Sequence, residues 1–323
     1  MSTVGEIPRA PAVPRTVTEV IRRGLDSAMA NWPLLLFRFA ETVFVAMLAV
    51  ATAIAVIVPM IVSIGLSSFR VNDPENAGEI LRNALVSHWI ILVYILVAVS
   101  AALLVIVAVH SFVIAGVARV FVDAERAAGP APSARQRFAV FSVEAWVAGG
   151  REAWWRVFWI YNIAYGVAGI VVMVPLLPLA GLILVFQAAP AAIVLSCLGL
   201  IVASFFALVV LLVTGLVCQK AIILVAQRPV DATASLRIAW RAMRADFSRH
   251  FAVAFIMIVL TIGVSGLLAT TSFGFAVPGV HTPFAAAIFL PARLALSFVS
   301  SVFSAAISNW FMASFAALTV EEG

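Results

Sequence analysis

The stretch from Val157 to Gln219 reads VFWIYNIAYGVAGIVVMVPLLPLAGLILVFQAAPAAIVLSCLGLIVASFFALVVLLVTGLVCQ, and its sixty-three residues include no Asp, Glu, Lys or Arg. One membrane-spanning helix needs about 20 apolar residues, so the run has room for two crossings and a short turn. Arg156 and Lys220 place a positive charge on each side of it. The stretch predicts an integral membrane protein whose chain returns to the side that it left.

The composition of the whole chain indicates a bilayer as its main solvent. Hydrophobic residues make up 64% and charged residues 11%, with a mean hydropathy of +1.14. Soluble domains contain about 45 to 50% apolar and about 25% charged residues. The net charge is +5 and nineteen of the twenty basic residues are Arg. Because these residues lie beside apolar runs, we expect them to contact anionic lipid and not nucleic acid.

Further apolar runs bring the predicted number of spans to six. We expect these spans at Thr42–Gly65, His88–His110, Val157–Leu177, Ala191–Leu216, Phe251–Thr271 and Arg293–Ala317. Sixteen of the twenty Lys and Arg residues fall in the N-terminal segment and the second and fourth connections, which share one face of the membrane. By the positive-inside rule both termini are cytoplasmic, in a multi-pass protein of the cytoplasmic (inner) membrane.

Each predicted pair of spans follows a segment with one spacing of apolar residues. Leu236, Trp240, Met243 and Phe247 lie at i, i+4, i+7 and i+11, which places them on one helical face. The same spacing occurs twice more, at Ile21, Leu25, Ala28 and Trp32 and at Val143, Val147, Gly150 and Trp154. The Gly149-Gly150 pair predicts that the copy before the third span is the weakest helix of the three.

The pattern predicts an all-α, polytopic fold made of three repeats, each an interfacial amphipathic helix followed by two spans. We expect a flexible cytoplasmic tail over residues 1–15 and a single six-helix membrane domain over 16–323, with repeats at about 16–130, 138–230 and 231–323. Basic amphipathic helices of this kind lie in the headgroup layer. The side chains expected to contact lipid headgroups are Arg22, Arg151, Arg237, Arg241 and Arg244.

Two segments carry a resemblance to a known family. They are SLRIAWRAMRADFSRHF, from Ser235 to Phe251, and the Asn31-Trp32-Pro33-Leu34-Leu35-Leu36 segment that leads into the first span. With the topology, they make the chain similar to a bacterial family of six-pass membrane domains of poorly defined function, related to the membrane domain that accompanies some glycerophosphodiester phosphodiesterases. In enzymes of that kind the chemistry belongs to a separate metal-binding barrel. The resemblance therefore transfers no catalytic residue to this sequence.

A small set of polar residues lies in or near the predicted spans. Arg38 and Glu41 are one turn apart, and we interpret them either as a proton or ion relay or, by preference, as a snorkelling Arg paired with a carboxylate. Asn162 and Asn309 line a cavity or, more often for such groups, hydrogen-bond a neighbouring helix. Arg293 is an anion-binding group or an anchor at the outer edge, and the second interpretation is favoured.

Serine residues form a stripe on the sixth predicted span. The stripe, beside the small Ala305, indicates a polar path or, by preference, close packing through small residues, and consists of Ser297, Ser300, Ser301, Ser304 and Ser308. The four histidines have no ligand-like spacing, and the sequence has no Gly-rich phosphate loop, His-Glu-x-x-His or Gly-x-Ser-x-Gly motif. We therefore expect no metal, no cofactor and no enzymatic activity.

These observations favour one function and leave a second open. The first is a non-enzymatic membrane protein that contacts anionic lipids, in envelope or lipid homeostasis or as the membrane subunit of a complex. Its expected partners are membrane lipids and a membrane protein or a second copy of the chain. The alternative is a transporter or channel for a small solute, which the internal repeats and the Pro59 in the first span favour.

Overall fold

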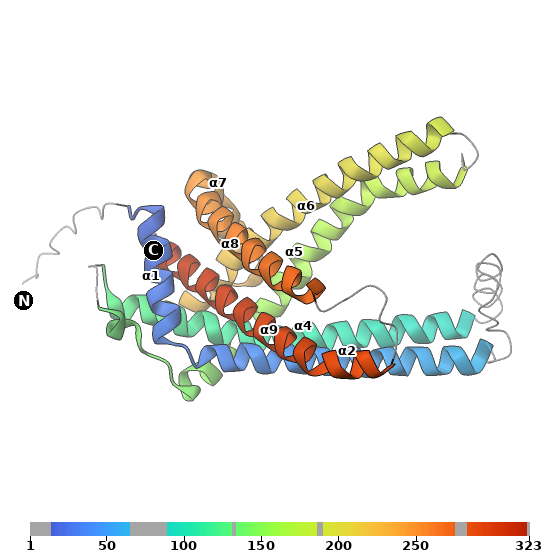
Figure 1. The fold of residues 1–323 in the computed structure, drawn as a ribbon. Helices are drawn as coiled ribbons and strands as arrows, with labels where there is room; N and C mark the ends of the chain where they lie inside the picture. The colour runs from blue at the N-terminus through green and yellow to red at the C-terminus, as the bar shows by residue number, and fades with distance from the viewer. Residues whose placement is uncertain (1–13, 65–88, 131–133, 186–189, 275–282, 322–323) are drawn as a thin grey trace, which may run out of the picture.

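The computed structural model describes residues 14–64, 89–130, 134–185, 190–274 and 283–321, and within these ranges the chain is helical with no strand (Figure 1). The predicted all-α class is confirmed. The elements in chain order are α1 (Val17–Ala30), α2 (Leu34–Ile64), α4 (Trp89–Ala128), the 3-10 helix η1 (Arg135–Phe138), α5 (Val143–Val185), α6 (Pro190–Gln227), α7 (Ala232–Ala245), α8 (Phe247–Gly274) and α9 (Pro283–Glu321).

Six of these helices are long and apolar enough to cross a membrane, which agrees with the predicted number of spans. Their qualifying segments are Leu34–Pro59, Val93–Ala128, Val143–Pro178, Cys197–Gln227, Phe247–Val264 and Ala295–Glu321. The helices extend well past several predicted boundaries. For example, α4 continues to Ala128, whereas the predicted span ends at His110. Its added turns carry charged residues but also a buried face, and tertiary packing of that face keeps them helical.

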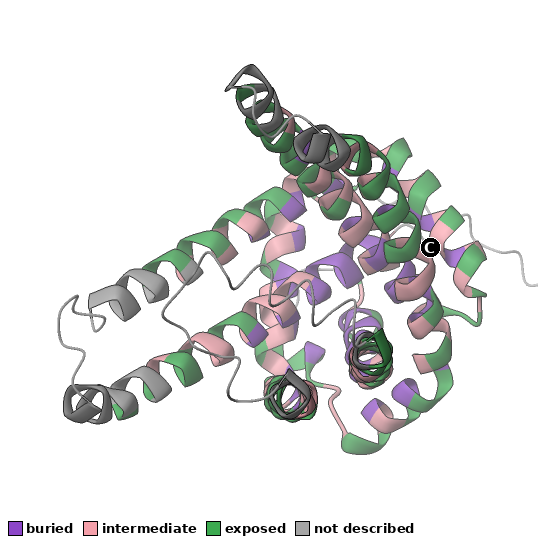
Figure 2. Cartoon of the chain, turned by 90° about the vertical axis from the view of Figure 1, so that its right-hand side faces the viewer, coloured by how far each residue is buried: buried purple, intermediate pink, exposed green. Residues whose placement is uncertain are grey.

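The long helices form three hairpins that meet at one end of the molecule, which we call the base, and diverge from it as arms. The hairpins are α2–α4, α5–α6 and α8–α9, and the two views show that the described parts of these arms run in different directions (Figures 1 and 2). Buried residues gather at the base and exposed ones run along the arms (Figure 2). Because the exposed arm residues are mostly Val, Leu, Ile and Phe, lipid is the solvent that suits them.

The core of the base comes from the last turns of α4, α6 and α9 together with α1 and α7. In α4 the residues from Val113 to Val122 are almost all buried, and in α6 the residues from Ala221 to Ala226 are buried without exception. A helix buried on every face is a central helix of a core. The base is therefore the packed, protein-like part of the molecule.

The helix α1 packs closely against α9, which differs from the predicted lipid-facing position. Its buried residues are Val20, Arg23, Gly24 and Ser27, whereas Trp32 of the predicted stripe is 60% exposed. A Cβ atom on Gly24 would lie 2.7 Å from the Cα of Ser314, so the glycine permits the contact. The helix is fixed by protein contact and does not rest on lipid alone.

The helix α7 shows the same division. Met243 of its predicted apolar stripe is buried in the core, while Trp240 and Phe247 of that stripe are about half exposed. Ser235 and Ala239 complete the buried side. Both α1 and α7 thus use one side for the protein and leave tryptophan at their edge, in the manner of an interfacial belt.

The predicted helix before the third span is not a separate element, and this corrects the expected repeat. Residues from Val143 onward continue without a break into the span as α5. The other two copies end at C-caps, at Asn31 after α1 and at Asp246 after α7. The third has no such break, so only two of the three copies match the predicted unit.

The glycine pair in α5 marks a helix crossing and not a weak helix. A Cβ on Gly149 would lie 2.5 Å from the Cβ of Arg119, and a Cβ on Gly116 would lie 2.6 Å from the carbonyl oxygen of Trp146. Small residues let two backbones approach to this distance. Tertiary packing, and not helix propensity, therefore decides the role of these glycines.

Candidate functional site

A cavity of about 540 Å³ lies between α2, α4 and α9, on the side of the base where the arms begin. The helical spacing of its lining residues explains why they share one space, since each helix contributes positions three or four residues apart. The lining consists of Arg38, Glu41, Thr42 and Val45 of α2, Ile106 and His110 of α4, and Ser300, Ser301, Ser304, Ala305 and Ser308 of α9. It is polar on the α9 side and charged on the α2 side.

Arg38 and Glu41 form the predicted ion pair. The Arg38 Nη1 atom donates to Glu41 Oε2 at 2.7 Å, and Nη2 donates to Ser308 Oγ at 2.8 Å. The Glu41 side chain is only 7% exposed. A carboxylate buried to this extent needs an opposite charge and further hydrogen bonds.

Glu41 has a second partner that the sequence did not reveal. Its Oε1 atom accepts a hydrogen bond from Nδ1 of His110, and His110 Nε2 lies 3.1 Å from the hydroxyl of Tyr161. Since an ionised carboxylate only accepts, Nδ1 carries a proton, and a neutral His110 then accepts from the Tyr161 hydroxyl. The result is a hydrogen-bonded chain from α2 through α4 to α5.

One signal in the sequence points to this chain in retrospect. His110 and Tyr161 are rare polar groups within otherwise apolar helices, on the basic side of their spans, as Glu41 is on its own. Three such groups at similar depth favour a shared site. Spacing gives no such hint, because His110 and Glu41 are 69 positions apart.

The serine stripe lines the cavity, so the preferred interpretation as a packing surface is wrong for four of its members. Ser300, Ser301, Ser304 and Ser308 face the cavity, and only Ser297 is not part of the lining. Ser301 donates to the carbonyl oxygen of Ser297 within α9. The small Ala305 beside them is buried.

The asparagines are not part of the cavity lining. The amide of Asn162 donates to the carbonyl oxygen of Phe158 in its own helix, at 2.8 Å, and reaches no neighbouring helix among the described residues. Asn309 is 5% exposed, and its Oδ1 atom has no hydrogen-bond partner within the described part of the chain. The side chain of Arg293 lies outside the described residues.

The five arginines predicted to contact headgroups share one property. Each is exposed, and none forms an ion pair with a side chain in the ranges that the structure describes. They are Arg22, Arg151, Arg237, Arg241 and Arg244. Their guanidinium groups are therefore available to ligands from outside the protein.

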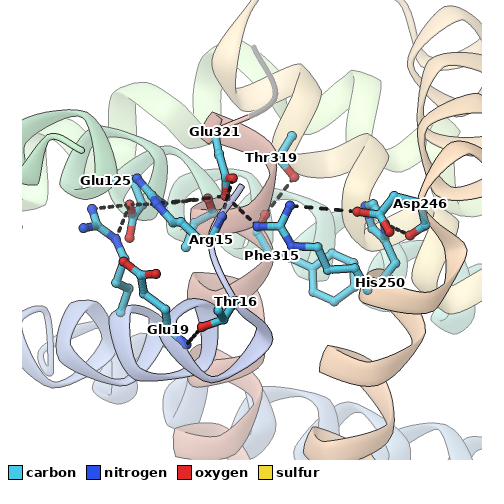
Figure 3. Close-up of polar contacts among 12 residues, drawn as sticks. Arg15, Thr16, Glu19, Glu125, Asp246, His250, Phe315, Thr319 and Glu321 are labelled. Atoms are coloured by element: carbon cyan, nitrogen blue, oxygen red, sulfur yellow. Dashed lines mark hydrogen bonds and ion pairs between the residues drawn. The ribbon is translucent and has the colours of Figure 1, made fainter. Parts of the chain in front are cut away.

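A second polar network, at the base, was not predicted at all. Arg23 Nη2 lies 2.8 Å from Glu125 Oε2, and Arg15 Nη1 lies 3.3 Å from the same oxygen. Glu321 accepts from the backbone N–H of Arg15 at 2.7 Å and from Arg249 at 2.8 Å (Figure 3). These residues come from α1 and the segment before it, α4, α8 and α9, so the network joins four helices and acts as a structural tie.

A buried Lys220–His250 contact lies beside this network. The Nζ atom of Lys220 is 2.7 Å from Nε2 of His250, and Nδ1 of His250 donates to the carbonyl oxygen of Asp246. The accepting nitrogen is therefore Nε2, and lysine is the donor. Both residues are at most 1% exposed. The pair connects α6 to the start of α8 inside the base.

No group of three or more His, Cys, Asp or Glu side chains placed to hold a metal ion occurs in the described part of the chain. What the fold and the cavity define is a class, an all-helical multi-pass membrane protein with a charged cavity near one end of its spans. No family model, curated protein or solved structure matches the chain.

Proposed function

We propose that this chain is a non-enzymatic protein of a bacterial cytoplasmic membrane that binds the anionic headgroup of a lipid in the cavity between α2, α4 and α9. The observation that carries the proposal is a cavity lined by Arg38, which is paired with Glu41, and by four serine hydroxyls, next to arms with apolar outer faces. Guanidinium and hydroxyl groups are common donors to phosphate. The proposed role lies in envelope or lipid homeostasis, alone or with a second copy or another membrane protein.

The depth of the cavity supports a headgroup as its ligand. From Trp89, where α4 begins, to His110 is about 31 Å at 1.5 Å per residue, close to the hydrocarbon thickness of about 30 Å. If the arm crosses the bilayer, His110 and the cavity lie at the headgroup level on the far side. Val45 and Ile106 then provide apolar walls for the first part of an acyl chain.

The charge distribution supports the orientation in this proposal. Arg119, Arg126, Arg135 and Arg137 belong to the end of α4 and the segment that follows, beyond the cavity. By the positive-inside rule this end, with the base and both termini, is cytoplasmic. The exposed arginines of α1 and α7 would then meet the anionic inner leaflet, as the sequence predicts.

Native mass spectrometry of the protein with phosphatidylglycerol tests the proposal. The double variant Arg38→Gln with Glu41→Gln removes the cation without leaving a buried unpaired carboxylate, and we expect about tenfold weaker retention because a hydrogen bond to a charged group contributes about 1.5 to 3 kcal/mol. Arg228→Gln, an exposed arginine outside the cavity, is the control. Equal retention by the double variant and the control would contradict the proposal.

A second candidate function, proton-coupled transport of a small solute, is favoured by one specific observation. The Glu41, His110 and Tyr161 side chains form a continuous hydrogen-bonded chain from the cavity toward α5. Such chains transfer protons in pumps and transporters. In proteoliposomes with a pH-sensitive dye, a proton flux that Glu41→Gln abolishes and Asn162→Ala preserves would favour this candidate, and no flux from the native protein would rule it out.

A further inference from the structure

An apolar groove of about 510 Å³ lies on other helices than the cavity, between α5, α6 and the start of α7. Its walls are mainly valines of the α5–α6 arm: Val167, Val171, Val209, Val210, Val213 and Val217. Branched side chains have few rotamers, so they do not readily turn into the groove and fill it. The groove shares no lining residue with the cavity.

One end of the groove differs in character from the rest. There Leu236, Arg237 and Trp240 of α7 complete the lining. Arg237 is exposed, and no described residue forms an ion pair or hydrogen bond with its side chain. Trp240 is 45% exposed beside it. An amphipathic ring and a cation at one end of an apolar groove are the arrangement expected at the boundary between headgroups and acyl chains.

We infer that this groove binds one anionic phospholipid, with an acyl chain along the valines and the phosphate on Arg237. The segments Ile163–Val171 and Val209–Val217 each extend about 12 Å at 1.5 Å per residue. That length is close to the depth of one leaflet, about half of a 30 Å hydrocarbon core. Charge complementarity selects an anionic lipid over a zwitterionic one, because no acidic side chain among the described residues pairs with Arg237 to offset its charge.

This inference deepens the sequence-based expectation for Arg237 by giving it a specific site. Arg241 and Arg244 lie on the same exposed side of α7 but do not line the groove. A general attraction to an anionic surface would use all three arginines alike. A bound lipid would depend on Arg237 more than on the other two.

The test uses phosphatidylglycerol that carries a photoreactive diazirine in one acyl chain, in phosphatidylcholine vesicles with the full-length protein, followed by peptide mapping of the adducts. We expect adducts in Ile163–Val171 and Val209–Val217 that unlabelled phosphatidylglycerol competes away and phosphatidylcholine does not. Arg237→Gln should reduce them about fivefold, and Arg244→Gln less than twofold, since the loss of one interfacial charge weakens binding by about that factor.

A pair of tryptophan variants tests the groove itself. Val167→Trp adds a ring at a groove position that is 57% exposed, and Val174→Trp adds the same ring on the same helix at a 65% exposed position outside the lining. We expect the first to abolish the groove adducts and the second to preserve them. Adducts spread evenly along the arms, equal effects of the two arginine variants, or equal effects of the two tryptophan variants would each overturn the inference.

The result is separable from that for the cavity. The Arg38→Gln and Glu41→Gln double variant leaves every groove residue in place, so it should leave the groove adducts unchanged. Loss of phosphatidylglycerol from the cavity with intact groove labelling would support both sites independently.

Discussion

The contact between α1 and α9 predicts a substitution that is normally stabilising in a helix but destabilising here. Gly24→Ala adds one methyl group at a position where the new Cβ would clash with Ser314 Oγ and lie 2.7 Å from both Ser314 Cα and N. The hydroxyl can rotate away, but the backbone atoms cannot. The two helices must therefore separate by several tenths of an ångström to restore ordinary contact.

The magnitude follows from two opposing terms. Alanine is favoured over glycine within a helix by about 1 kcal/mol. Overpacking of a close interface costs about 1 to 3 kcal/mol, and here the new methyl group meets the buried backbone of Ser314, which cannot move aside as a side chain can. With an overpacking cost in the upper part of that range, about 2 to 3 kcal/mol, we expect a net loss of about 1 to 2 kcal/mol and weaker packing of α1 on the base.

The assay is the free energy of unfolding from a denaturing-detergent titration in mixed micelles, with Gly169→Ala as the control. Gly169 lies within α5, and a Cβ there would have no neighbouring atom within 4 Å, so Gly169→Ala should stabilise the protein by up to about 1 kcal/mol. The two variants should thus shift in opposite directions. If Gly24→Ala were stabilised as much as Gly169→Ala, α1 would not be docked on α9 and the described base would be wrong.

Three further predictions concern buried groups. Glu125→Ala removes the carboxylate shared by Arg15 and Arg23 and should cost about 3 to 5 kcal/mol in the same titration. The control Glu144→Ala, in the exposed first turn of α5, should cost no more than about 1 kcal/mol. Similar losses for the two variants would show that the network contributes little. Asn31→Ala removes hydrogen bonds to Ser27, Phe138, Val140 and Phe141, so it should cost about 2 to 4 kcal/mol and speed proteolysis near η1. The control Asn162→Ala loses one hydrogen bond within its own helix and should cost under about 1 kcal/mol. Equal losses for the two variants would refute this role of Asn31. In detergent, where the spans are no longer embedded in a bilayer, N-ethylmaleimide should modify Cys197, which lies on the outside of α6, before Cys218, which is buried in the base. The reverse order in peptide mapping would contradict the described burial.

The spans and one ion pair were predictable from the sequence because both depend on local pattern. Apolar length decides whether a helix crosses a membrane, and a separation of three residues places Arg38 beside Glu41 on any helix. The same logic gave the helical character of α1 and α7. It erred at Gly149-Gly150, where glycine lowers helix propensity but a neighbouring helix requires its small size.

The rest of the cavity depends on how distant helices meet, which local pattern does not encode. His110 approaches Glu41 because α2 and α4 pair side by side, and Ser308 reaches Arg38 across 270 positions. Likewise the network around Glu125 joins segments from both ends of the chain. The sequence identifies some of the polar residues of the cavity and of the network around Glu125, but only the fold shows which of them contact one another.

The divergence of the three hairpins gives the molecule the mechanics of levers on a common pivot. Each arm is anchored by the densely packed base, and the described side chains of α2, α4, α5 and α6 away from the base are mostly exposed (Figure 2). A small rotation at the pivot is therefore amplified at the arm tips. Because a mismatch with bilayer thickness costs a fraction of a kcal/mol per ångström, a thinner membrane favours more tilted arms and a thicker one more upright arms. We therefore expect the angle between the arms to change with the thickness of the surrounding bilayer.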